Sequence, residues 1–155
     1  MPVAPRKASN ISLRPARQSD YDFAAALYFD SAKPLLTALD RWNESRVVAR
    51  FGRAFKPEQA HIIRADGDNI GWLQVSQSVD GFHLHQLHLV DRFRNRGIGT
   101  SLIQSLLERA RRAKRPVALN VMRGNPAISL YRRLGFSVVG EDAEKFKMRW
   151  VGTRA

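Results

Sequence analysis

The residues from Arg94 to Gly99 read Arg-Asn-Arg-Gly-Ile-Gly and could bind a diphosphate group. Glycine lets the backbone turn tightly and brings its N–H groups close to an anion. A helix is expected to follow, and the N-terminus of a helix offers unpaired amides and a positive dipole end. The arginines add positive charge on both sides. This stretch therefore predicts an anion-binding cradle at the start of a helix.

Two commoner phosphate-binding loops do not fit the same residues. The dinucleotide fingerprint requires glycine where the chain has Leu102, and the loop for nucleoside triphosphates requires Gly-Lys-Ser/Thr, which is absent. Glycine pairs at helix starts also occur for packing reasons, so the loop alone leaves a purely structural interpretation open. The residues on either side of the loop have to decide between the two interpretations.

The histidine pair His83 and His85 is the second candidate for chemistry, because the two residues stand two apart on an expected strand. Such side chains share one face of a strand unless a bulge intervenes, and His88 is then expected on the opposite face. Histidine has an ordinary pKa of about 6.5, which suits a general base. The pair is a candidate base or relay. The alternative is two hydrogen-bonded strand residues without a catalytic role.

Tyr131 is the third candidate and lies on a second expected helix. Asn125 is expected as the N-cap of that helix, Pro126 as its first residue and Gly135 as its C-terminal stop. Tyr131 shares a helical face with apolar residues, and this pattern alone is typical of a core tyrosine. A phenol with a pKa of about 10 can also donate a proton to a thiolate.

The elements that must position these residues form an α+β pattern. Apolar residues from Ile98 to Ala113 recur at the spacing of one buried helical face. Further helices are expected from Asp20 to a break at Lys33-Pro34, and roughly from Asp40 to Phe55. The expected strands are residues 11–14, 61–64, 70–78, 82–90, 116–121, 136–139 and 145–151. The strand at 116–121 follows a helix and should be parallel to its predecessor, whereas the others are expected to be antiparallel.

Size and composition narrow the classes of protein. A chain of 155 residues predicts one domain, which we assign to residues 11–155. The polar residues 1–10 before it are expected to form a disordered leader. No run approaches the roughly 18 apolar residues of a membrane span, so we expect a cytoplasmic protein without membrane contact. The absence of cysteine excludes disulfides and a cysteine nucleophile. The histidines lack a nearby carboxylate, so no metal is expected.

Charge is the other outlier, because 26 Lys and Arg against 14 Asp and Glu give a formal net charge of +12. Residues 92–115 contain eight basic residues and one acid. Those at the helix start suit a polyphosphate ligand, while those at its end stabilise the negative end of the dipole. The run lacks interleaved aromatic residues, so no specific nucleic acid is expected. The alternative to an enzyme is a basic module that binds nucleic acid, or one that senses an acyl-CoA without catalysis.

Two motifs at the right separation resemble the GNAT superfamily of acetyl-CoA-dependent N-acetyltransferases. The superfamily's cofactor motif is Arg or Gln, two residues, Gly, one residue, then Gly or Ala. It is matched by Arg94, Gly97 and Gly99. The later signature of a helix with Tyr, followed by Gly-Phe, is matched by Asn125, Ala127, Tyr131, Gly135 and Phe136. The resemblance implies a GNAT-like α+β fold, with a mixed, largely antiparallel central sheet of six to seven strands and about four flanking helices.

The resemblance also implies a reaction and a set of site residues. An acetyl group would pass from acetyl-CoA to a primary amine by direct attack in a ternary complex, with no metal. Tyr131 would protonate the departing thiolate. Backbone groups of Leu87 and Leu89 would hold the pantetheine arm. The implied cofactor-binding residues are Leu87, Leu89, Arg94, Asn95, Arg96, Gly97, Ile98, Gly99, Thr100 and Asn125.

The acceptor side is less defined. His83-Leu84-His85 is similar to the stretch in arylalkylamine N-acetyltransferases that carries two histidines implicated as bases. Asp40, Trp42 and Glu44 lie in the region where relatives build acceptor pockets. The acceptor is expected to be a small-molecule amine or a peptide amine, and a homodimer is left open.

Overall fold

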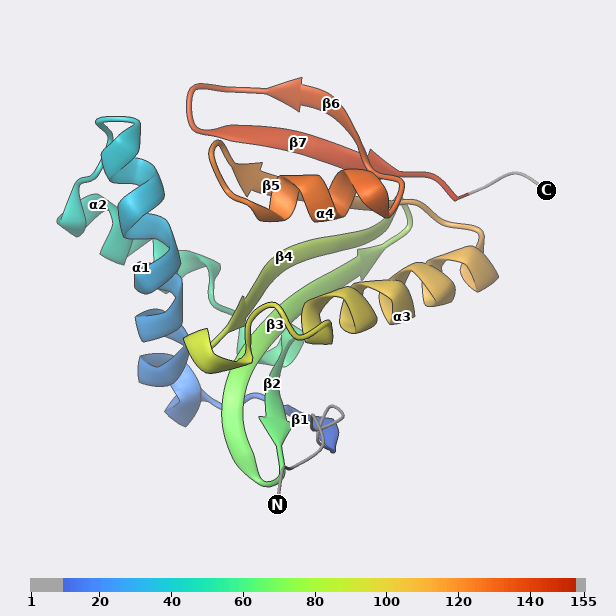
Figure 1. The fold of residues 1–155 in the computed structure, drawn as a ribbon, viewed down its shortest axis with the longest axis horizontal. Helices are drawn as coiled ribbons and strands as arrows, with labels where there is room; N and C mark the ends of the chain where they lie inside the picture. The colour runs from blue at the N-terminus through green and yellow to red at the C-terminus, as the bar shows by residue number, and fades with distance from the viewer. Residues whose placement is uncertain (1–9, 153–155) are drawn as a thin grey trace, which may run out of the picture.

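The computed structural model describes residues 10–152, and most of the predicted leader therefore lies outside the described residues. A seven-stranded sheet carries helices on both faces (Figure 1). The strands are β1 (Ile11–Pro15), β2 (Ala60–Ala65), β3 (Asp68–Ser78), β4 (Gly81–Leu89), β5 (Val117–Met122), β6 (Ser137–Glu141) and β7 (Lys145–Trp150). The helices are α1 (Tyr21–Ala38), α2 (Glu44–Ala54), α3 (Ile98–Ala113) and α4 (Ala127–Arg133), with 3₁₀ turns η1 (Gln18–Asp20), η2 (Pro57–Gln59) and η3 (Asp91–Phe93).

The strands are ordered β1-β2-β3-β4-β5-β7-β6 across the sheet. Neighbouring strands are antiparallel except for β4 and β5, which are parallel. This arrangement confirms the predicted mixed, largely antiparallel sheet and the parallel strand that follows a helix. The turn at Asp66-Gly67 has positive φ at both residues, as a two-residue hairpin turn requires.

Strands β4 and β5 pair over only a short length at their N-terminal ends. The parallel register joins Phe82–Leu84 to Val117–Leu119 and goes no further. Figure 1 shows the two strands diverging from there toward α1. Beyond the paired residues each strand therefore has an edge without a strand partner, and such an edge presents free N–H and C=O groups.

A β-bulge interrupts β4 at His85. The register between β3 and β4 shifts by one residue there and leaves His85 without a partner. His85 contacts Ser76, whereas His88 packs on Trp72, and both partners lie on the same face of β3 because they are four residues apart. The prediction that His88 points to the face opposite His85 is therefore wrong. A bulge breaks the alternation of a strand and re-aims its side chains.

Helices α1 and α2 cover one face of the sheet, and α3 and α4 cover the other. An aromatic cluster joins α1 and α2 to the sheet, with Phe51 and Trp72 almost fully buried at its centre. On the other face, Leu106 of α3 and Tyr131 of α4 pack on apolar residues of β4, β5 and β7. Each layer fixes one side of the opening between β4 and β5.

Helix α1 continues past the break predicted at Lys33-Pro34. Proline cannot donate the intrahelical hydrogen bond, which normally ends or kinks a helix. Pro34 is exposed, so the bond is missing on the solvent side, while Ala32 and Leu36 continue the buried stripe. Burial of that stripe outweighs the local effect of proline.

Helix α2 begins later than predicted. It begins at Glu44 because the Asn43 side chain caps it, accepting a hydrogen bond from the Arg46 backbone N–H at 2.9 Å. Its end at Ala54, just before Lys56-Pro57, agrees with the prediction. Asp20 occupies the N-cap position of α1, but its carboxylate binds the Arg14 guanidinium instead of the helix amides.

Candidate active site

The predicted cradle is a loop between η3 and α3. Two of its residues adopt left-handed backbone angles, Asn95 with φ 60° and Gly97 with φ 83°. Glycine adopts such angles without steric cost, and asparagine tolerates them. Ile98 follows directly and is buried against Ile63 and Ile70, so the start of α3 is anchored in the core. The loop is therefore held in place by a packed helix start.

The backbone amides of this loop are free to bind a ligand. The first recorded bond of α3 runs from the Ser101 N–H to the Gly97 carbonyl at 3.0 Å. Within residues 10–152, no hydrogen bond is recorded for the N–H groups of residues 95–100. A Cβ added to Gly97 would meet no atom within 4 Å, so the concave side is open. These features fit a diphosphate at the N-terminus of a 16-residue helix.

The three arginines of the cradle differ in their contacts. Arg94 donates from Nε to the Leu89 carbonyl at 3.0 Å and from Nη1 to Asp91 at 2.9 Å. Its side chain therefore ties the loop to the end of β4. The guanidinium groups of Arg92 and Arg96 lie over the ring of Phe93, at 5.1 and 5.2 Å from its centroid. Both are exposed and add positive charge beside the free amides.

The basic residues at the other end of α3 make structural contacts. Arg109 lies over the Phe82 ring at 5.0 Å, and Arg111 lies over Trp150 at 5.3 Å. Arg111 also pairs with Glu108 at 2.9 Å. A helix has its unpaired N–H groups at its N-terminus, so this C-terminal end of α3 offers none. Only the N-terminal end of α3 therefore combines basic side chains with free backbone amides.

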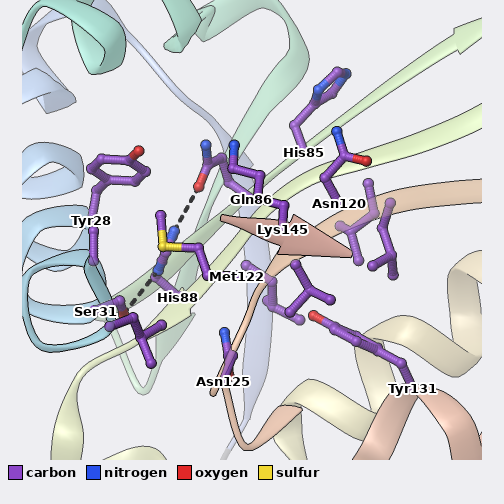
Figure 2. A pocket seen from close by; sticks show the side chains of 16 residues that line it. Tyr28, Ser31, His85, Gln86, His88, Asn120, Met122, Asn125, Tyr131 and Lys145 are labelled. Atoms are coloured by element: carbon purple, nitrogen blue, oxygen red, sulfur yellow. Dashed lines mark hydrogen bonds between the residues drawn. The ribbon is translucent and has the colours of Figure 1, made fainter. Parts of the chain in front are cut away.

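A cavity of about 110 Å³ occupies the opening between β4 and β5, and α1 closes one side of it. Figure 2 shows the side chains that line it. Four predicted site residues take part in the lining: His85, Leu87, Tyr131 and Asn125. The predicted residues His83 and Leu89 are not part of this lining.

Cradle and cavity are neighbours. A Cβ added to Gly99 of the cradle would lie 3.8 Å from Cδ2 of Leu87, which lines the cavity. The fold therefore places the predicted anion cradle directly beside a small cavity.

Tyr131 directs its hydroxyl into the cavity (Figure 2). Its ring packs on Phe136 at a centroid distance of 5.7 Å, and the residue is only 9% exposed. Within residues 10–152 no hydrogen bond to the hydroxyl is recorded. Burial raises the pKa of Tyr131 to about 12. The group is therefore a protonated donor whose hydroxyl has no recorded protein partner.

Asn125 precedes α4 and stabilises its first turn. Its side-chain oxygen accepts a hydrogen bond from the Ala127 N–H at 2.9 Å. The helix begins at Ala127, with Pro126 in the cap position, one residue later than predicted. The predicted stop is confirmed, because α4 ends at Arg133 and Gly135 follows with φ 104°. The Asn125 amide group thus has its oxygen committed to the helix.

His83 and His85 are stacked, with ring centroids 4.2 Å apart. Nε2 of His85 also lies 2.7 Å from the Ser76 hydroxyl. Burial lowers the pKa of both histidines, that of His85 to about 4, where the charges of His83 and Lys56 add to the effect. Both imidazoles are therefore neutral near pH 7, and the stacking disfavours a second proton on the pair.

His88 lies in the cavity wall, although no role was predicted for it. Nε2 of His88 is 2.7 Å from Oε1 of Gln86, and Nδ1 is 3.3 Å from the Ser31 hydroxyl (Figure 2). An amide oxygen can only accept, so Nε2 donates and Nδ1 accepts from the serine. Burial, and secondly the charge of Arg94, lowers the pKa of His88 to about 4. Its two nitrogens are occupied, so His88 positions Gln86.

Sequence reasoning also missed Tyr28, Gln86 and Lys145, which line the same cavity. They lie on α1, β4 and β7 and share no motif, so only the tertiary structure brings them together. Trp42 and Glu44 line a different hollow against α1, and Asp40 lines neither.

Residues 10–152 contain no group of three or more His, Cys, Asp or Glu placed to hold a metal ion. In the same part of the chain, none of the helices has the length and apolar character needed to span a bilayer.

Comparison with known families identifies the class of this protein. Residues 21–136 match the model of the acetyltransferase (GNAT) family. The match covers the cradle and, apart from Lys145, the residues that line the cavity. The chain therefore belongs to the GNAT family and is an acyltransferase, and the predicted resemblance is confirmed.

Particular relatives narrow the comparison. The chain is 31% identical over 144 residues to the L-methionine sulfoximine/L-methionine sulfone acetyltransferases of Pseudomonas paraeruginosa and Pseudomonas aeruginosa, covering 84% of this chain and 82% of each relative. Among solved structures, the PaiA N-acetyltransferase of Thermoplasma acidophilum in complex with coenzyme A has a TM-score of 0.73 at 18% identity, covering 92% of this chain and 99% of that one. This similarity between the two structures confirms the fold.

Proposed function

We propose that this protein transfers an acetyl group from acetyl-CoA to a primary amine by direct attack within a ternary complex. The observation that carries the proposal is the adjacency of two parts. The free amides of residues 95–100 form an anion cradle at the start of α3. Beside it, the Tyr131 hydroxyl points into the cavity between β4 and β5 without a recorded protein partner.

The cofactor would be held mainly by backbone groups. Residues 95–100 would receive the diphosphate, and the exposed guanidinium groups of Arg92 and Arg96 would add charge. The edge of β4 beyond Leu84 has no strand partner, so backbone groups at Leu87 and Leu89 would hold the pantetheine arm. Asn125 would contact it from the opposite side of the opening. Bound there, acetyl-CoA supplies the thioester that is attacked.

Tyr131 would assist the departure of the thiolate. Burial keeps its hydroxyl protonated, since its pKa is raised to about 12. A coenzyme thiol should resemble cysteine, with a pKa of about 8.5. Complete proton transfer from such a phenol is uphill, so Tyr131 acts mainly as a hydrogen-bond donor to the sulfur as negative charge develops.

The stacked histidines would remove the proton from the attacking amine. A free alkyl amine has a pKa of about 10.4 and is mostly protonated near neutral pH. His83 and His85 are neutral there, which is the form that accepts a proton. His85 lines the cavity and is itself solvent-exposed, so it would accept the proton and release it to water, while His83, stacked on it, would support its ring.

The relatives suggest the first acceptors to try. Their name refers to the sulfoximine and sulfone of methionine, both of which are amino acids with a free amine. This chain shares 31% of their residues over 144 positions. Small amino acids and amino-acid analogues are therefore the first acceptor class, with peptide amines second.

The proposal is tested by an acceptor screen. Amines, amino acids and peptides are incubated with acetyl-CoA and the protein, and release of the coenzyme thiol is measured together with the mass of the product. Amine-dependent thiol release with an N-acetyl product is expected. Direct attack also requires that the protein alone gains no acetyl group in its intact mass. Coenzyme A binding without turnover on any amine would contradict the proposal.

A further inference from the structure

Lys145 is a cation in the cavity wall that has no recorded counterion. It stands at the first position of β7, is partly buried and lines the cavity between β4 and β5. Its ammonium group makes no recorded ion pair or hydrogen bond within residues 10–152. A partly buried lysine in such a position retains unsatisfied donors that face the cavity.

The nearest acidic neighbour along the chain is already neutralised. Glu144 is buried, and its carboxylate lies 3.3 Å from both Arg46 and Arg50 and 3.8 Å from Arg41. Three guanidinium groups on one carboxylate leave positive charge in excess. Lys145 therefore stands beside a cationic cluster. Burial, and secondly the charge of Arg50, lowers the pKa of Lys145, while the charges of Glu144 and Asp142 act in the opposite direction.

A second donor faces the same space. The side-chain oxygen of Gln86 accepts a hydrogen bond from Nε2 of His88 at 2.7 Å, which fixes the orientation of the amide. Its NH₂ group remains available at the cavity wall, and Figure 2 shows Gln86 and Lys145 on the same side of the cavity, away from Tyr131. One end of the cavity is therefore rich in donors, and the described residues that line the cavity include no Asp or Glu.

We propose that Lys145 and Gln86 bind the carboxylate of an α-amino-acid acceptor, whose amino group then faces the Tyr131 end of the cavity. The inference rests on the proposed function and narrows its substrate class to amines that carry an adjacent carboxylate. A carboxylate accepts hydrogen bonds from both an ammonium group and an amide, and it supplies the negative charge that this wall lacks. The cavity of about 110 Å³ suits the small head group of an amino acid.

The test compares an acid with its amide in variants of two lysines on one strand. Steady-state acetylation of L-methionine sulfone and of its carboxamide is measured for the wild type, Lys145→Met, Lys145→Arg and Lys147→Met. Lys147 is exposed on the same strand and does not line the cavity, so it is the matched control. The ratio of kcat/KM for acid over amide is compared between variants, because intrinsic differences between the two amines then cancel.

Lys145→Met should lower that ratio by about tenfold to hundredfold through a higher KM for the acid, as loss of one charge-assisted hydrogen bond predicts. Lys145→Arg should keep most of the preference, and Lys147→Met should leave it unchanged. An unchanged ratio in Lys145→Met, or an equal fall in Lys147→Met, overturns the inference while the transferase proposal stands.

A binding measurement separates the two proposals. L-methionine sulfone is titrated calorimetrically into the protein saturated with coenzyme A. Binding that is weakened in Lys145→Met but not in Lys147→Met supports the carboxylate site even if no acetyl transfer occurs, in which case only the proposed function fails. Absence of both binding and turnover overturns the carboxylate site.

Discussion

The cradle and the cavity wall lie side by side but are built in opposite ways. The cradle is one continuous segment, residues 95–100, and offers backbone amides whose direction is set by two left-handed residues and a helix start. The wall is assembled from side chains on α1, β4, β5, β7 and α4. The difference teaches that a backbone-built site is specified by local sequence, whereas a side-chain site depends on tertiary packing.

The largest effect is expected at Gly97. In Gly97→Glu the new side chain would enter the open cradle and place a negative charge where we propose that the diphosphate binds, so coenzyme A affinity should fall by about a hundredfold or more. Calorimetry on the purified variant measures this. Gly67→Glu is the matched control, because Gly67 also has positive φ, at 91°, and a Cβ added there would meet only the end of the Arg64 side chain, at 3.9 Å. Equal losses in both variants would show that backbone strain alone is responsible.

A smaller effect is expected at Tyr131 in the cavity. Tyr131→Phe removes the donor without changing the packing on Phe136, so kcat should fall about tenfold to hundredfold while coenzyme A affinity is unchanged. Steady-state kinetics and calorimetry separate the two quantities. Tyr21→Phe, in the aromatic cluster of α1, should have wild-type kcat. A wild-type rate in Tyr131→Phe would remove the proposed role.

Loss of the histidine pair should lower kcat by only about tenfold, because imidazoles with lowered pKa values are weak bases. His85→Ala should slow turnover more than His83→Ala, since His85 lines the cavity. The acidic limb of the wild-type kcat profile should lie below pH 6.5, the ordinary histidine value, and should flatten in the double variant. An unchanged limb there would show that another group accepts the proton.

The smallest effect concerns stability and His88. Its folded pKa of about 4 lies below the unfolded value of about 6.5, so the unfolded chain binds more protons between these pH values. The contribution of neutral His88 to the free energy of unfolding is therefore present above pH 6.5 and is lost as the pH falls toward 4. The loss is on the order of 1 kcal/mol between pH 7 and pH 6. Denaturant unfolding at both pH values, with His88→Phe showing a shallower dependence, measures it.

Local sequence predicted the parts that depend on local chemistry. The strands, α3, the parallel pair and the cradle follow from periodicity, turn residues and the motif at Arg94, Gly97 and Gly99. Three features depended on tertiary packing and could not be predicted. The bulge at His85 arises from the register of β3, the buried stripe carries α1 through Pro34, and Lys145 reaches the cavity only after β7 pairs with β5.

The central claim is that the amides at the start of α3 bind the cofactor's diphosphate, and a crystal structure with coenzyme A tests it most directly. The account predicts diphosphate oxygens at about 3 Å from backbone nitrogens within residues 95–100, with the thiol directed toward Tyr131. A diphosphate bound instead among the arginines at the C-terminal end of α3, with the cradle amides unoccupied, would contradict it.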